Sequence, residues 1–117
     1  MRDRLKLLLT TDAVGGVWTY SLELAQALAE ADDVMVYLAV LGPSPSAEQL
    51  DAAAATPGLQ LVDTGLPLDW LADEPAQLRE AAQRIDELAT SAGVDLVQLH
   101  TPALAVIPFN VPVVGVV

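Results

Sequence analysis

Short apolar runs alternate along this chain with stretches in which apolar residues recur every three or four positions. The run Val34–Leu41 is apolar at every position, which is typical of an inner strand of a parallel sheet. The stretch Pro75–Ala92 has the period of an amphipathic helix, with a proline in its first turn and Gly93 as its C-terminal cap. Its expected buried stripe consists of Leu78, Ala82, Ile85, Leu88 and Ala89.

The same patterns predict the other elements. The predicted strands are Leu5–Thr10, Val34–Leu41, Leu59–Asp63, Asp95–Leu99 and Val113–Val117. The predicted helices are Val17–Ala31, a short helix capped by Ser46 and Gln49 that ends before Pro57, Pro75–Ala92, and one turn at Ala103–Ile107. Because parallel strands are joined by right-handed crossovers, this order predicts an α/β fold: a Rossmann-like open parallel sheet of about five strands, in the order 3-2-1-4-5, with helices on both faces.

The net charge of the chain makes some classes of binding partner less favourable than others. Five Lys and Arg stand against sixteen Asp and Glu, a formal charge of −11 on 117 residues. This length fits a single domain, residues 1–117. The acidic balance argues against nucleic acid and against an anionic membrane surface, because both need clustered Lys and Arg. The hydrophobic content of 53% argues against disorder.

The chain has no cysteine and one histidine. Disulfides, Cys-ligated zinc, iron–sulfur clusters and thiol catalysis are therefore excluded, and we expect no metal site. The apolar run after the basic start, Leu7–Leu9, is too short for a secretory signal. No stretch approaches the length of a transmembrane helix, so we expect no membrane segment and a cytoplasmic location.

Ligands of open α/β sheets bind beyond the carboxyl ends of the strands, at the switch point of the strand order. That edge is expected to carry Asp12, Gly15 and Gly16 after the first strand, and His100 and Thr101 after the fourth.

Gly15 and Gly16 lie between a strand and a helix N-terminus, where glycines let a ligand approach the backbone and the helix dipole favours an anionic or hydroxyl-rich group. A tight turn without ligand contact explains the pair equally well. Neither G-x-G-x-x-G nor Gly-Lys-Ser/Thr occurs, which disfavours a dinucleotide cofactor and a Walker loop.

The other candidate residues each have two interpretations. His100 is a candidate catalytic residue or a packing histidine, and Asp12 binds a sugar hydroxyl or caps the next turn. Of Trp18 and Tyr20, one is expected to pack inward and the other to line the cleft. No Ser-His-Asp set and no carboxylate pair of defined spacing occurs.

Three segments together resemble the N-terminal domain of GT-B glycosyltransferases, especially retaining family 4, the group 1 glycosyltransferases. Leu8–Leu28 resembles the family's strand, Gly-Gly-Val and amphipathic helix. Asp95–Thr101, DLVQLHT, is similar to the D-x-V-H-x-H-[ST] strand, with Gln98 where the first histidine is usual and His100 matching the second. Val111–Val117 is similar to the strand that leads into a His-Ser or His-Gly pair, and the chain ends before that pair.

The resemblance implies a two-domain transferase with the active site between the domains. Its partners would be a nucleotide-sugar donor, held mainly by a C-terminal domain with an E-x7-E motif, and a glycan, lipid-linked or small-molecule acceptor. By this analogy Gly15 and Gly16 lie near the donor diphosphate. Asp12, Trp18, His100 and Thr101 lie on the acceptor side. The resemblance implies no cofactor and no metal.

The chain ends inside an apolar strand and has no E-x7-E motif. We therefore expect a truncated acceptor-side domain that is inactive by itself and self-associates through its exposed C-terminal strand.

Two alternatives stay open. A response-regulator receiver domain has similar length, with Asp12 ending the first strand, Asp63 as phosphoacceptor and Thr101 as the switch hydroxyl. It lacks the second acidic residue near Asp12 and the lysine after the fifth strand. A non-enzymatic α/β interaction domain would instead pair its last strand with another chain.

Overall fold

A computed structural model describes residues 5–14, 16–66, 75–100, 104–105 and 107–115. The strands are β1 (Lys6–Asp12), β2 (Met35–Leu41), β3 (Leu59–Asp63), β4 (Leu96–Leu99) and β5 (Val113–Gly115). The helices are α1 (Val17–Asp32), α2 (Ala47–Ala54) and α3 (Pro75–Ala92). The five predicted strands and the three longer predicted helices are present, with ends that differ by at most two residues. The last two residues of the predicted fifth strand, and part of the predicted turn at Ala103–Ile107, lie outside the described residues.

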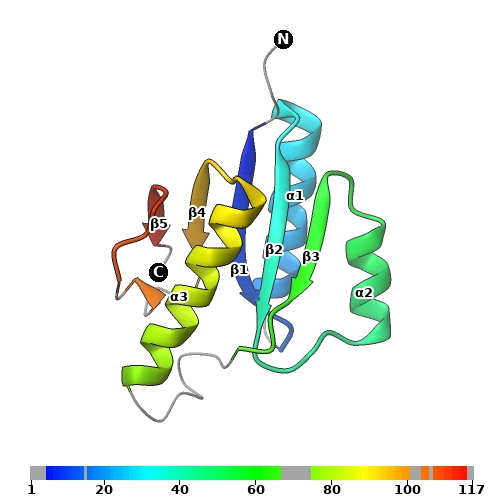
Figure 1. Ribbon diagram of the computed structural model, residues 1–117. Coiled ribbons are helices and arrows are strands. Elements are labelled where there is room, and N and C mark those ends of the chain that lie inside the picture. The colour runs from blue at the N-terminus through cyan, green and yellow to red at the C-terminus, as the bar shows by residue number, and fades with distance from the viewer. Residues whose placement is uncertain (1–4, 15, 67–74, 101–103, 106, 116–117) are drawn as a thin grey trace.

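The five strands form one parallel sheet in the order β3-β2-β1-β4-β5, which confirms the predicted order (Figure 1). β1 lies in the middle, paired with β2 along its whole length and with β4 from Leu7 to Leu9. After β1, the chain adds β2 and β3 on one side of it. The chain then crosses back and adds β4 and β5 on the other side of β1. The carboxyl ends of β1 and β4 lie at this reversal.

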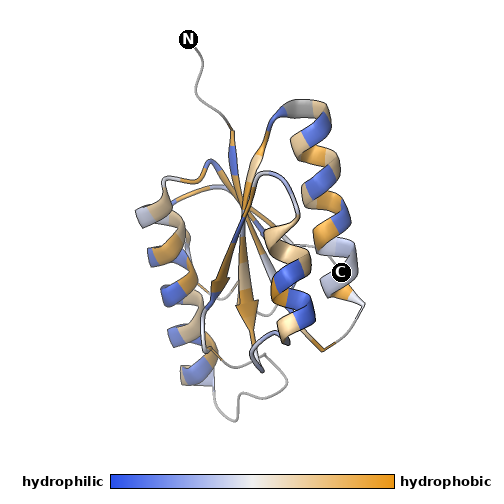
Figure 2. Ribbon diagram, turned by 90° about the vertical axis from the view of Figure 1, so that its right-hand side faces the viewer, coloured by the Kyte–Doolittle hydropathy of each residue, from blue (hydrophilic) through white to orange (hydrophobic). Residues whose placement is uncertain are grey.

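Two apolar layers cover the sheet, one on each face. Leu8 of β1 packs with Ile85 of α3 on one face. Leu7 and Leu9, its neighbours in sequence, pack with Ala25 of α1 on the other face. The alternation follows from the two-residue repeat of a strand. Figure 2 shows the sheet nearly edge-on, with helices on both sides.

The ends of the helices follow local sequence signals. Ser46 Oγ accepts a hydrogen bond from the Gln49 backbone N–H at 3.2 Å, and Gln49 Oε1 accepts one from the Ser46 N–H at 2.9 Å. This is the capping box predicted for α2. Gly93 follows α3 with φ +68°, as expected of a C-terminal cap. Among the described residues, no helix has both the length and the apolar character needed to cross a bilayer.

Candidate functional site

The carboxyl ends of β1 and β4 meet at the switch point of the sheet, where His100 follows β4. The arrowheads of both strands point to the same edge in Figure 1. The His100 backbone N–H donates to Thr10 Oγ1 at 2.9 Å, which fixes the end of β4 against β1. The predicted juxtaposition of His100 with the β1–α1 segment is therefore present in the fold.

Both ring nitrogens of His100 have side-chain partners. Nδ1 lies 3.3 Å from Ser21 Oγ of α1, and Nε2 lies 2.8 Å from Gln98 Nε2 of β4. Gln98 and His100 are two residues apart, so they share one face of the strand. Ser21 is fully buried and His100 is half-buried, so the imidazole is held between the sheet and α1.

Partial burial lowers the pKa of His100 below the usual value of 6.5, because removal from water disfavours the charged imidazolium. At neutral pH the ring is therefore uncharged, with one nitrogen that donates and one that accepts. In this state the ring carries no positive charge that would attract a phosphate.

Asp12 closes β1 and shapes the turn that follows. Its Oδ1 accepts a hydrogen bond from the Val14 N–H at 2.9 Å, which is the turn-capping interpretation of this residue. Gln49 of α2 supports the same turn, since its Nε2 donates to the Ala13 carbonyl at 2.8 Å. The turn that leads into α1 is thus held from two sides.

Gly16 is the N-cap of α1, and no side chain caps that helix. Its φ of −67° is accessible to every residue type, and a Cβ at this position would meet no atom within 4 Å. Nothing in the described chain therefore requires glycine here, and the space beside it is open. Gly15 and Thr101 lie outside the described residues.

The structure separates the two aromatic residues at the start of α1. Trp18 is 6% exposed and packs in the layer that contains Val36 and Leu38. Tyr20 is 50% exposed, and its ring centroid lies 5.6 Å from that of His100. Trp18, expected on the acceptor side, thus packs inward, and Tyr20 is the aromatic residue at the edge of the site.

Sequence reasoning did not assign Ser21 to the site, left open which of Trp18 and Tyr20 lines it, and noted Gln98 only as a departure from a motif. Ser21 could have been recognised from its spacing. Ser21 precedes Ala25 of the sheet-facing stripe by four residues, so the helical repeat places its polar side chain on the face toward the sheet. Contact between Gln98 and His100 follows from their i, i+2 spacing only once a strand is assumed.

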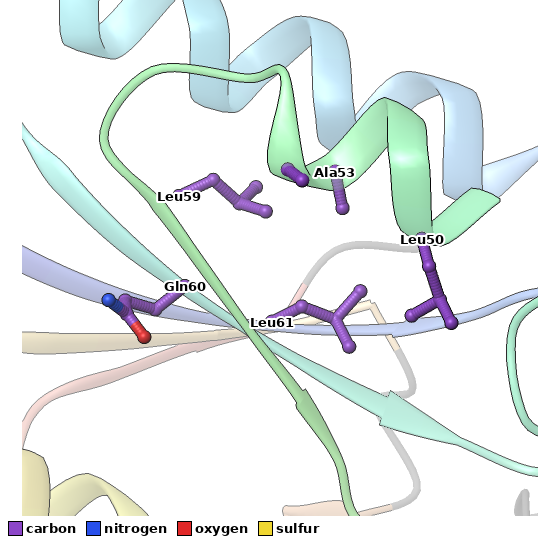
Figure 3. A pocket seen from close by; sticks show the side chains of 6 residues that line it. Leu50, Ala53, Leu59, Gln60 and Leu61 are labelled. Atoms are coloured by element: carbon purple, nitrogen blue, oxygen red, sulfur yellow. The ribbon is translucent and has the colours of Figure 1, made fainter. Parts of the chain in front are cut away.

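Two surface hollows lie elsewhere. One, of about 210 Å³, lies between α2 and β3 (Figure 3). Leu59 and Leu61 point toward α2 in this view, and Gln60 points away. The other, of about 340 Å³, lies between the end of β3 and α3 and includes Arg84 and Glu87. Neither includes His100, Asp12 or Gly16 among its lining residues.

The strand order bears on the receiver alternative. Receivers have the order 2-1-3-4-5, which places the ends of the first and third strands side by side. Here β2 lies between β1 and β3, so Asp63 is separated from Asp12 by a whole strand. The proposed phosphoacceptor and its acidic neighbour therefore do not share one site, and the receiver interpretation is wrong.

No protein-family model and no curated protein matches this chain. Among solved structures, the chain is similar to a glycosyltransferase from Rickettsia africae, with a TM-score of 0.68 and 17% identity over 97% of this chain and 30% of that one. It is also similar to Phytolacca americana UGT2 in complex with UDP-2fluoro-glucose and pterostilbene, with a TM-score of 0.51 and 18% identity over 85% of this chain and 26% of that one. The chain thus spans about a third or less of these proteins. The likeness is one of fold, a Rossmann-like domain of the kind that glycosyltransferases contain.

Proposed function

We propose that this chain is the acceptor-side domain of a GT-B glycosyltransferase of retaining family 4. In this proposal the parent enzyme transfers a sugar from a nucleotide sugar to a glycan, lipid-linked or small-molecule acceptor. The observation that carries the proposal is the position of His100 and the open N-terminus of α1 at one switch point, beside Asp12. The fold shared with two glycosyltransferases supports it, and one of those structures is a complex with UDP-2fluoro-glucose and pterostilbene.

The chemistry of the two groups of residues suits the two substrates. The N-terminus of α1 has no side-chain cap and no acidic residue in its first turn, so its backbone N–H groups and dipole favour a diphosphate. The exposed ring of Tyr20, beside the uncharged imidazole of His100, suits the apolar face of a sugar. Positioning and stabilisation of the leaving diphosphate would then provide most of the rate acceleration.

The proposal includes a second domain that holds most of the donor, so the 117-residue chain is expected to bind weakly and to transfer nothing by itself. It also includes a cytoplasmic location and transfer without a divalent metal. These features follow from the family resemblance.

The test is a nitrogen-15 NMR titration of the purified chain with UDP, UDP-glucose and GDP-mannose as probes. We expect at least one probe to shift the amide signals of Gly16, Val17 and His100 more than those of α3. The Gly16→Val variant should lose these shifts, and Ala52→Val, on the exposed face of α2, should keep them. Absence of any shift at this edge would contradict the proposal, and sugar transfer by the chain itself would contradict the need for a second domain.

A second candidate rests on the edge strand β5, where Val114 is 46% exposed. A non-enzymatic interaction domain would pair this edge with another chain through backbone hydrogen bonds. Loss of concentration-dependent association in Val114→Lys, together with no response to the nucleotide probes, would favour this candidate.

A further inference from the structure

Four side chains at the switch point form one row of hydrogen bonds. Thr11 Oγ1 donates to the Asp12 carbonyl at 3.3 Å, and Ser21 Oγ donates to Thr11 Oγ1 at 3.3 Å. Ser21 Oγ contacts His100 Nδ1, and His100 Nε2 contacts Gln98 Nε2. Thr11 and Ser21 are 1% and 0% exposed, so water does not offer them other partners. The row therefore links the backbone of β1 to the side chain of Gln98.

The direction of this row follows from counting protons. A hydroxyl group has one hydrogen to donate. The Asp12 carbonyl can only accept, so Thr11 donates its hydroxyl hydrogen to that carbonyl. Ser21 donates its own hydroxyl hydrogen to Thr11 Oγ1. Ser21 Oγ is then an acceptor toward His100, which requires the proton of the ring on Nδ1.

The same reasoning continues to Gln98. With Nδ1 protonated, Nε2 of the neutral ring is an acceptor and needs a donor opposite it. The amide nitrogen of Gln98, at 2.8 Å, is that donor. The amide oxygen of Gln98 is consequently turned away from the ring, and among the described residues it receives no hydrogen bond.

We propose that Ser21 and Gln98 hold His100 as the neutral Nδ1–H tautomer, and that His100 is a positioning residue which presents the Gln98 amide oxygen to a ligand hydroxyl. The second half rests on the proposed function, because it takes the sugar acceptor as the ligand. In this arrangement both imidazole nitrogens are occupied by the protein. The group that distinguishes one acceptor hydroxyl from another is therefore Gln98, and His100 sets its orientation.

Proton uptake by His100 would break the row. An imidazolium donates from both nitrogens, so its Nε2–H would face the N–H of Gln98, and the amide would have to flip. Besides Glu23 and Glu30 of α1 and Lys6 at the start of β1, two titratable groups on the elements around the ring lie at the site itself. α1 contributes Tyr20, and β1 ends at Asp12, whose Oδ1 is bonded to the Val14 N–H. The lowered pKa of His100 agrees with a ring that stays neutral.

The tautomer can be measured directly, because His100 is the only histidine of the chain. Long-range proton–nitrogen NMR spectra of the purified chain at pH 7.5 should show a protonated Nδ1 and an unprotonated Nε2. A protonated Nε2, or an average of both forms, would overturn the proposal.

Two variants, each with a matched control, separate the role of Ser21 from that of Gln98. Ser21→Ala removes the acceptor for Nδ1–H and should give averaged tautomers, and Ser91→Ala on the exposed face of α3 should not. Gln98→Glu replaces the donor by a carboxylate and should raise the pKa of His100 by about one pH unit or more. Gln60→Glu adds the same charge on β3, three strands away, and should leave it unchanged. Equal titration curves for Gln98→Glu and Gln60→Glu would overturn the assignment of Gln98.

The presentation of the Gln98 oxygen is tested by its side-chain amide signals. In the wild type these signals should show one fixed orientation, with nuclear Overhauser contacts from Nε2–H to the His100 ring. In His100→Ala the chemical shifts of the Gln98 amide protons should change, because the fixed orientation is lost. Unchanged Gln98 amide signals in His100→Ala would overturn the positioning role. None of these measurements needs a sugar, so failure of nucleotide or glycan binding would count against the proposed function alone.

Discussion

The ring of Tyr20 lies 5.6 Å from the imidazole of His100, measured between centroids, and is tilted by 56° to it. One residue comes from the first turns of α1 and the other from the end of β4, 80 positions later in the chain. Their contact marks where the two elements at the switch point meet.

Replacing Tyr20 tests this contact. Tyr20→Phe keeps an aromatic ring and should leave the His100 ring-proton shifts near their wild-type values, whereas Tyr20→Leu removes the ring current and should move them. Because Tyr20 is 50% exposed, Tyr20→Leu should cost no more than about 1 kcal/mol in the free energy of unfolding. Proton NMR and urea unfolding provide the two readouts. Identical His100 shifts in both variants would show that the rings do not meet in solution.

Gly16→Val should fold as the wild type does, because the φ of −67° suits any residue and the Cβ meets open space. We expect a loss of about 1 kcal/mol or less, from the poorer N-cap. The matched control is Gly93→Val, where φ is +68° and a β-branched residue is strained, with an expected loss of about 1–3 kcal/mol. Urea unfolding measures both, and a larger loss at Gly16 than at Gly93 would show a hidden structural role for Gly16.

The lowered pKa of His100 predicts a pH dependence of stability. Below about pH 6.5 the unfolded chain binds a proton that the folded ring binds only at lower pH. The free energy of unfolding should therefore fall as the pH is lowered through 6.5, and level off once the folded ring also takes up the proton.

The sixteen acidic residues also titrate, so the measurement is a difference. Unfolding of the wild type and of His100→Gln is followed from pH 7.5 to pH 5. The stability advantage of the wild type over the variant should shrink with falling pH. A constant difference would contradict the predicted shift.

Asp86 of α3 holds the segment before β5. Its Oδ1 accepts from the Asn110 N–H at 3.0 Å and its Oδ2 from Asn110 Nδ2 at 2.8 Å. Asp86→Ala should loosen this segment at a cost of about 1 kcal/mol. Amide hydrogen exchange at Val113 and Val114 should speed up while exchange in β2 stays slow. Glu87→Ala, the exposed neighbour, is the control, and equal exchange in the two variants would refute the role of Asp86.

Gln49 has two separable roles, in the capping box of α2 and in support of the β1–α1 turn. Gln49→Glu keeps the acceptor of the capping box and loses the donor to the Ala13 carbonyl. It should shift the amide signals of Asp12, Val14 and Gly16. Ser46→Ala should instead cost about 1 kcal/mol in stability and leave those signals near their wild-type positions. The reverse pattern would mean that the turn does not depend on α2.

The sequence by itself determined the elements, their order and the edge of the sheet that carries His100. Local rules were enough for this, because apolar period, capping signals such as Ser46 with Gln49, and Gly93 act within a few residues of one another. The right-handed crossover rule then constrained how the predicted strands assemble.

Only the tertiary structure decided which side chains meet at that edge. Trp18 and Tyr20 are two residues apart and so lie on different faces of α1, and the structure shows that Trp18, 6% exposed, is on the buried face and Tyr20, 50% exposed, is not. Contact between Ser21 and His100 spans 79 positions, and no local pattern encodes such a pair. The donor order of the row from Thr11 to Gln98 depends on all of its members at once, because each hydroxyl has a single proton to give.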